Sequence, residues 1–160
     1  GKSIDEVFTT ANAKLCESNE AGMFVTAWMG VLDITNGNVE FANAGHNPPL
    51  VRHADGSFEY LKSKPGFILA GMEGMKYRKN VLSPGDEIYL YTDGVTEATN
   101  SENELYGEER LLNLLNTLQG LTGEEVCRAV KADIDAFSGD APQFDDITML
   151  YLKYNGGTGK

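Results

Sequence analysis

The order of secondary-structure signals along these 160 residues predicts an antiparallel α+β fold. Strand pairs with hairpin signals come first, two amphipathic helices follow, and a strand-like run closes the chain. Short turns join antiparallel strands, whereas a parallel sheet requires strands that alternate with helices. The sequence therefore favours sheets built from hairpins, with the helices segregated from them.

The N-terminal part of the chain reads as a helix followed by a hairpin. Ser3 and Glu6 form a capping-box pattern, and apolar residues at helical spacing predict a helix over residues 4–15. Residues 24–34 are strand-like. An Asn-Gly pair then predicts a tight turn, and residues 39–44 are expected to form the second strand of this hairpin.

The middle of the chain predicts two more strand pairs. Residues 50–53 and 58–61 are joined through an Asp-Gly pair, which is typical of a hairpin turn. Strand character resumes over residues 77–82 and continues over residues 87–92. The turn between them, at residues 83–86, contains a Pro-Gly pair that fits the central positions of a type II turn.

The C-terminal part predicts two helices and a last strand. The helices are expected at residues 108–118 and 124–137, the second after a capping box that begins at Thr122. The strand is expected at residues 147–154, and the glycine-rich residues 155–160 read as a flexible tail.

Composition and charge narrow the classes of function. An apolar content of 41% and a charged content of 23% are typical of one globular domain. The formal charge of −11 would repel nucleic acid and an anionic membrane surface, so neither is expected as a partner. No apolar run approaches the roughly 20 residues of a membrane span.

Acidic residues mark the ends of two predicted strands. Asp93 ends the apolar run of residues 87–92 and is followed by Gly94, while Asp145 and Asp146 open the last strand. Taken singly, each fits a turn or a strand cap. Three acids at one sheet edge would repel one another without a cation, and carboxylates are the ligands that Mg²⁺ and Mn²⁺ prefer. The sequence thus leaves open a metal site.

His46 is a further candidate, between Gly45 and Asn47. A neutral imidazole can serve as a metal ligand or a general acid. The alternative is a loop histidine whose ring satisfies backbone groups in a tight turn. We favour the loop interpretation, because no second histidine stands at metal-ligand spacing.

These motifs, in this order, resemble the metal-dependent serine/threonine protein phosphatases of the PPM, or type 2C, family. The resemblance is closest to the bacterial SpoIIE/RsbU branch and extends from about residue 3 to residue 154. The matching motifs lie at residues 21–33, 42–50, 82–86, 90–98, 106–111 and 144–148.

The resemblance implies an αββα sandwich of two antiparallel sheets flanked by helices. It also implies a centre of two Mn²⁺ or Mg²⁺ ions, where an activated water hydrolyses phosphoserine or phosphothreonine. Asp93 and Asp145 correspond to metal ligands of the family. Asp146, Gly94 and His46 are secondary candidates.

The sequence departs from the family pattern at its N-terminus. Residues 1–154 match the C-terminal portion of the phosphatase domain, without its first strands and first metal motif, an Asp-x-x-Gly element. We therefore expect this fragment alone to bind metal weakly or not at all and to be inactive. The sheet edge left open is expected to favour a homodimer.

The family likeness implies a cytoplasmic role in bacterial signalling. The expected substrate is a phosphorylated anti-sigma-factor antagonist, and the expected upstream partner is a sensor domain in the same longer chain. The alternative is a non-catalytic module with a PPM-like fold that binds or regulates a partner. An intact upstream Asp-x-x-Gly element would support the enzyme, and its absence would support the binding module.

Overall fold

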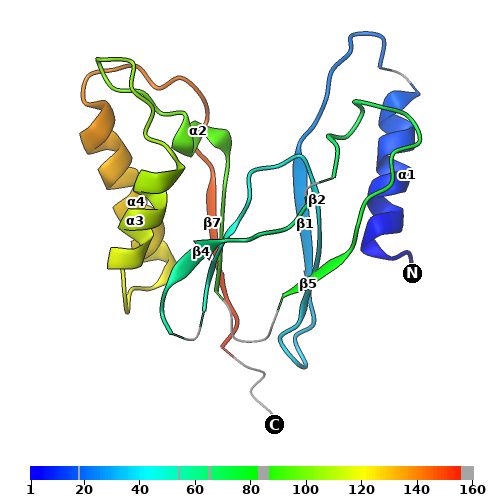
Figure 1. The fold of residues 1–160 in the computed structure, drawn as a ribbon, viewed down its shortest axis with the longest axis horizontal. Coiled ribbons are helices and arrows are strands. Elements are labelled where there is room, and N and C mark those ends of the chain that lie inside the picture. Colours follow the sequence, from blue (N-terminus) through cyan, green and yellow to red (C-terminus); the bar gives the residue numbers. More distant parts are fainter. Residues whose placement is uncertain (18, 54, 65, 83–86, 156–160) are drawn as a thin grey trace. The chain divides into compact units, whose positions relative to one another are not determined.

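The computed structural model describes residues 1–17, 19–53, 55–64, 66–82 and 87–155. They divide into two compact units. The first contains Gly1–His46 and Lys62–Pro84, and the second contains Asn47–Leu61 and Gly85–Tyr154. Each unit carries an antiparallel sheet with helix packed on it, as Figure 1 shows. The predicted α+β class with two antiparallel sheets is confirmed.

The first unit pairs one helix with a sheet. Over the described residues, its strand order is β1 (Ala27–Leu32), β2 (Val39–Ala44) and β5 (Asn80–Leu82). Helix α1 (Ile4–Cys16) packs on β2. The helix begins where the capping box predicts, because the Glu6 carboxylate accepts a hydrogen bond of 2.9 Å from the Ser3 amide.

The core of the first unit combines side chains of α1 and β2 with the loop between β4 and β5. Its buried members are Ile4, Phe8, Ala42, Ala44, Leu69 and Tyr77. Burying this apolar surface contributes about 25 cal/mol per Å², which is what holds a single helix on the sheet.

The β1–β2 hairpin is confirmed, but its turn is longer than the Asn-Gly pair predicts. Residues 33–38 separate the two strands. The Asp33 carboxylate accepts from the Thr35 amide at 2.9 Å, and the Asp33 carbonyl accepts from the Gly37 amide at 2.7 Å. Gly37 has a φ of +82°, a value that favours glycine. Asp33 therefore starts the turn earlier than the sequence signal indicated.

The second unit contains the segments with the candidate acids. Its described strands form a sheet in the order β4 (Phe58–Tyr60), β3 (Leu50–Arg52), β6 (Glu87–Tyr91) and β7 (Met149–Lys153). All neighbouring pairs are antiparallel, and β6 pairs with β7 from Glu87–Lys153 to Tyr91–Met149.

Two helices pack on this sheet. Helix α3 (Glu108–Thr117) contacts β4, and helix α4 (Gly123–Ser138) contacts β7. The Glu125 carboxylate accepts from the Thr122 amide at 2.8 Å, so the predicted capping box starts α4. The largest fully buried side chains of this core are Tyr89, Leu50, Leu111, Leu115, Ile134, Val95, Val126 and Val130.

Some predicted boundaries differ from the structure. The strands expected at 24–34, 77–82 and 147–154 are shorter in the structure, where they correspond to β1, β5 and β7. Within the described residues, the strands on either side of the predicted turn at residues 83–86 do not pair with each other: β5 pairs with β2, and β6 pairs with β3 and β7. The short helix α2 (Asp93–Thr96) was expected as a turn. The turn predicted at residues 83–86 and the tail beyond residue 155 lie outside the described residues. In the described part, no helix combines the length and apolar character that crossing a bilayer requires.

Candidate metal centre

The ends of β6 and β7 bring the two acidic segments together. The Thr92 amide donates to the Thr148 carbonyl at 3.0 Å, which extends the pairing one step beyond the regular strands. The Thr92 hydroxyl donates to the Asp146 carbonyl at 3.0 Å and accepts from the Thr148 amide at 3.0 Å. Thr92 immediately precedes Asp93. One side chain therefore links the Asp93 segment to the Asp145–Asp146 segment.

Gly94 allows these segments to approach closely. A Cβ at this position would lie 2.5 Å from the Asp146 carbonyl oxygen and 2.9 Å from its carbon. Those distances are far below van der Waals contact, so any side chain would push the Asp145–Asp146 loop away. Gly94 has a helical backbone, so its importance lies in the space it leaves and not in a left-handed conformation.

Asp93 begins α2, with Thr92 as the N-cap residue. Its carboxylate accepts from the Gly94 amide at 3.1 Å, and its carbonyl accepts from the Glu97 amide at 2.8 Å. Burial raises the pKa of Tyr91, two residues before Asp93 on β6, to about 12.

The Asp145–Asp146 loop is ordered by its own polar contacts. The Asp145 carboxylate accepts from the Asp146 amide at 2.7 Å, and the Gln143 side-chain amide donates to the Asp145 carbonyl at 2.8 Å. Asp93, Asp145 and Asp146 are all exposed. Each ionised carboxylate has about four acceptor positions, which leaves oxygen lone pairs for a cation.

The chemistry of these groups fits part of a Mg²⁺ or Mn²⁺ site. Both ions prefer oxygen ligands, and Mg²⁺ requires about six of them. Within the described residues, no group of three or more acidic, histidine or cysteine side chains is arranged to hold a metal ion. The acids present therefore fit a partial shell, to which other groups would have to be added.

His46 lies in the first unit, in the loop that follows β2. Its Nδ1 is 3.1 Å from the Thr26 hydroxyl. The Asn43 side chain accepts from the His46 amide at 2.8 Å and donates to the His46 carbonyl at 2.9 Å. The structure thus gives His46 a part in local loop structure. A ligand role for His46 stays a prediction.

Two residues that support the acids were not identified from the sequence. Thr92 belongs to the Thr-Asp-Gly motif, and a hydroxyl next to the aspartate was the available signal for it. Gln143 had no such signal, because its contact with the Asp145 carbonyl depends on the course of the loop.

Solved structures with a similar fold are PP2C-type phosphatase domains. The SiaA-PP2C domain of Pseudomonas aeruginosa matches with a TM-score of 0.77 and 22% identity, over 94% of this chain and 61% of that one. The RsbU and RsbW domains of Rv1364c from Mycobacterium tuberculosis match with a TM-score of 0.70 and 25% identity, over 96% of this chain and 42% of that one. The fold is that of a PP2C-type phosphatase domain.

The chain belongs to the SpoIIE family, whose model, described as stage II sporulation protein E, matches residues 1–155. Protein IcfG of Synechocystis is 34% identical over 141 residues, which are 87% of this chain and 22% of IcfG. The phosphoserine phosphatase RsbU of Bacillus subtilis is 25% identical over 151 residues, which are 92% of this chain and 44% of RsbU. The chain thus spans less than half the length of either relative. RsbU is named as a phosphoserine phosphatase, and the structural neighbour PstP as a serine/threonine protein phosphatase. At the level of the family, the class of enzyme is therefore a phosphoprotein phosphatase, which is a hydrolase.

Metal ions occur in structures of this fold. The catalytic domain of the phosphatase PstP, solved in complex with two manganese ions, matches with a TM-score of 0.63 and 15% identity, over 94% of this chain and 71% of that one. The carboxylates at the ends of β6 and β7 are oxygen donors of the kind that Mg²⁺ and Mn²⁺ prefer.

Proposed function

We propose that this chain forms part of a metal-dependent protein phosphatase that hydrolyses phosphoserine or phosphothreonine. The observation that carries the proposal is the link that Thr92 makes between the Asp93 and Asp145–Asp146 segments. Membership of the SpoIIE family supports the reaction class. RsbU, which is named as a phosphoserine phosphatase, supports the substrate class.

In this proposal, Asp93 and Asp145 hold Mn²⁺ or Mg²⁺, with Asp146 as a neighbouring oxygen donor. When bound, two ions would activate a water and polarise the phosphoryl oxygens. Further ligands are needed to complete the shell, because the described residues bring no group of three or more acidic, histidine or cysteine side chains together to hold a metal ion. The chain's own residues position the carboxylates: Thr92 and Gln143 fix the carbonyls of the acidic loop. Gly94 provides the space for the two segments to meet.

We further propose that the substrate is a phosphorylated anti-sigma-factor antagonist in the bacterial cytoplasm, and that an upstream sensor domain controls the reaction. The similarity to RsbU and to the RsbU and RsbW domains of Rv1364c supports this assignment. The chain has a formal charge of −11 and would repel a phosphate group. Bound metal ions would offset this repulsion at the site where the phosphate binds.

The test measures Mn²⁺-dependent hydrolysis of p-nitrophenyl phosphate by the full-length protein. Asp93→Asn and Asp145→Asn should each reduce turnover to background, because an amide is a weaker ligand than a carboxylate. Asp140→Asn, an exposed acid close to the same loop, is the matched control and should retain wild-type turnover. Wild-type rates in either of the first two variants at saturating Mn²⁺ would overturn the assigned roles.

A further inference from the structure

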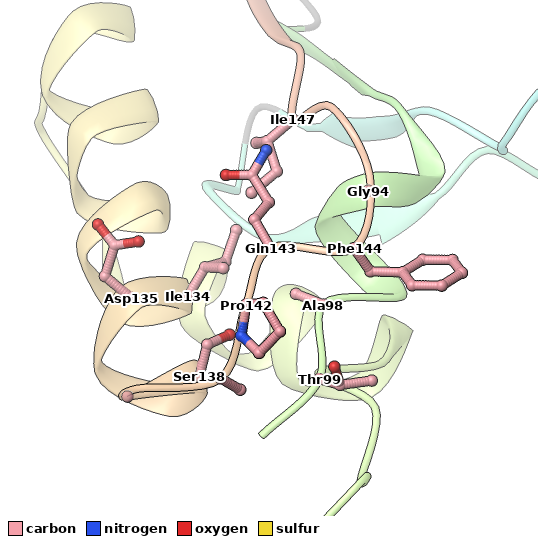
Figure 2. Close-up of a pocket in the computed structure, with 12 residues that line it drawn as sticks. Gly94, Ala98, Thr99, Ile134, Asp135, Ser138, Pro142, Gln143, Phe144 and Ile147 are labelled. Carbon is pink, nitrogen blue, oxygen red and sulfur yellow. The ribbon is translucent and has the colours of Figure 1, made fainter. Parts of the chain in front are cut away.

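A cavity of about 190 Å³ lies beside the acidic segments of the second unit. As Figure 2 shows, it lies between the C-terminal end of α4, the end of α2 and the loop that leads into β7. Apolar side chains form much of its lining: Ala98, Ile134, Ala141, Pro142, Phe144 and Ile147. None of these residues has a role in the metal centre described above.

The cavity has a mixed lining, in which apolar side chains lie beside the neutral polar residues Thr99, Ser138 and Gln143. Asp135 is the one charged residue among its lining residues in the described part of the chain, and its carboxylate is paired with the Lys131 ammonium at 2.5 Å on α4. A charged group bound in the cavity would lose its hydration without gaining an oppositely charged partner. An apolar guest would gain the free energy of burial. The apolar part of the lining therefore favours an apolar group over a charged one.

The position of the cavity relates it to the proposed reaction. Its lining includes Gly94, which follows Asp93, and Phe144, which precedes Asp145. Phe144 is 77% exposed, an unusual state for a phenylalanine beside a concave apolar surface. An extended peptide advances about 3.3 Å per residue. A substrate residue near the phosphoserine can thus reach the cavity.

We propose that this cavity is a substrate subsite, which takes an apolar side chain within three residues of the phosphorylated serine or threonine. The inference rests on the proposed function. The volume supports a single side chain as the occupant, since a cavity of about 150 Å³ can hold a benzene ring. The Phe144 ring, which points away from Ile134 and Pro142 in Figure 2, would turn to cover the bound side chain from the rim.

The experiment uses the full-length protein and a set of phosphoserine peptides. The peptides carry glycine and serine around the phosphoserine, and leucine replaces one residue at a time from three positions before it to three after it. One position should raise kcat/KM about 10-fold or more over the glycine peptide, because a well-placed apolar group gives this discrimination. Ala141→Leu fills the cavity, so the ratio of kcat/KM for the leucine peptide to kcat/KM for the glycine peptide should fall close to one. Ala132→Leu, on an exposed part of α4 outside the cavity, should keep the ratio.

A binding measurement provides a second readout. A non-hydrolysable phosphonate version of the best peptide should shift the methyl resonances of Ile134 and Ile147, and Phe144→Ala should weaken its binding while the fold is retained. Equal kcat/KM for all peptides, with normal hydrolysis of p-nitrophenyl phosphate, would overturn the subsite alone. If the control variant Ala132→Leu lost the leucine preference in the same way as Ala141→Leu, the subsite proposal would also be overturned. Absence of p-nitrophenyl phosphate hydrolysis in the wild type would instead overturn the proposed function.

Discussion

The two residues that organise the candidate centre carry no charge. The hydroxyl of Thr92 contacts the Asp146 carbonyl and the Thr148 amide, and the missing side chain of Gly94 leaves room for that carbonyl. A carboxylate can be useful to a metal only if its backbone is held in place. Mutation of a residue in such a supporting position typically weakens metal affinity about 10–100-fold.

Substitution of Thr92 tests this supporting role. Thr92→Val keeps the shape of the side chain but leaves the Asp146 carbonyl and the Thr148 amide without their partner. We expect a loss of about 1 kcal/mol in unfolding free energy and about a 10-fold weaker affinity for Mn²⁺. Thr92→Ser retains the hydroxyl and should bind Mn²⁺ nearly as the wild type does. Calorimetric Mn²⁺ titration of the full-length protein measures the affinity, and equal values for the valine and serine variants would contradict the role.

Polar side chains connect the elements within each unit. In the first unit, Asn12 of α1 is 1% exposed and holds the loop before β5. Its side chain accepts from the Ala70 amide at 2.9 Å and donates to the Met72 carbonyl at 2.9 Å. In the second unit, Asp133 of α4 accepts from the Arg110 guanidinium of α3 at 2.9 Å and from the Tyr106 hydroxyl at 2.7 Å.

Removing the side-chain amide of Asn12 should loosen the loop while the helix stays folded. Asn12→Ala removes the partner of the Ala70 amide and the Met72 carbonyl and an acceptor of the buried Tyr77 hydroxyl, so we expect a loss of about 2 kcal/mol in unfolding free energy. Hydrogen exchange at the Ala70 amide should become faster than in the wild type. Asn113→Ala, at an exposed position of α3, is the control and should leave both measurements unchanged. Unchanged protection of Ala70 in Asn12→Ala would contradict this account.

The Arg110–Asp133 pair predicts a pH-dependent contribution to stability. The hydrogen bond from Arg110 is the largest cause that lowers the pKa of Asp133 below its ordinary value. A carboxyl with a lowered folded-state pKa stabilises the fold above its unfolded pKa of about 3.9, and this contribution is lost as pH falls through the folded pKa.

Asp133→Asn should therefore cost about 1–3 kcal/mol at pH 7, and the difference from wild type should shrink below about pH 4. Urea unfolding at a series of pH values measures it. Glu124→Gln removes an exposed helix pair with Arg128, and it should change stability by less than about 0.5 kcal/mol. A difference for Asp133→Asn that stays constant from pH 7 to pH 3 would argue against the linkage.

Each half of the chain has a core of its own. Unit 1 buries α1 against β2, and unit 2 buries α3 and α4 against its four-stranded sheet. The candidate acids Asp93 and Asp145 belong to unit 2 alone. The described residues supply too few ligating side chains in one place for a full metal shell.

We predict that the 160-residue chain alone binds Mn²⁺ weakly and hydrolyses p-nitrophenyl phosphate at background rates. The physical reason is the partial ligand shell formed by Asp93 and Asp145. The measurement compares this chain with the full-length protein at equal concentration and saturating Mn²⁺. Circular dichroism of the isolated chain confirms that it is folded. Robust Mn²⁺-dependent turnover from the folded 160-residue chain would contradict the partial shell.

Much of the fold could be predicted because its signals are local. Capping boxes and apolar periodicity located α1 and α4 to within a residue, since both act within one or two helical turns. Strand ends were less accurate, because their pairing partners lie far along the chain. The early turn at Asp33 and the short helix α2 were missed for a related reason. The sequence around each of them is compatible with more than one backbone conformation, and contacts in the folded chain decide between these conformations.

The chain's residues alone identified the acidic strand ends, the order of the elements and the likeness to PP2C-type phosphatases, because these follow from residue types and short spacings. The meeting of the Asp93 and Asp145–Asp146 segments, the supporting contacts of Thr92 and Gln143 and the apolar cavity beside them came from the folded arrangement. The register between β6 and β7 brings the two acidic segments together, and it joins strands more than 50 residues apart in sequence. The Gln143 contact and the cavity depend in addition on the course of the loop that follows α4.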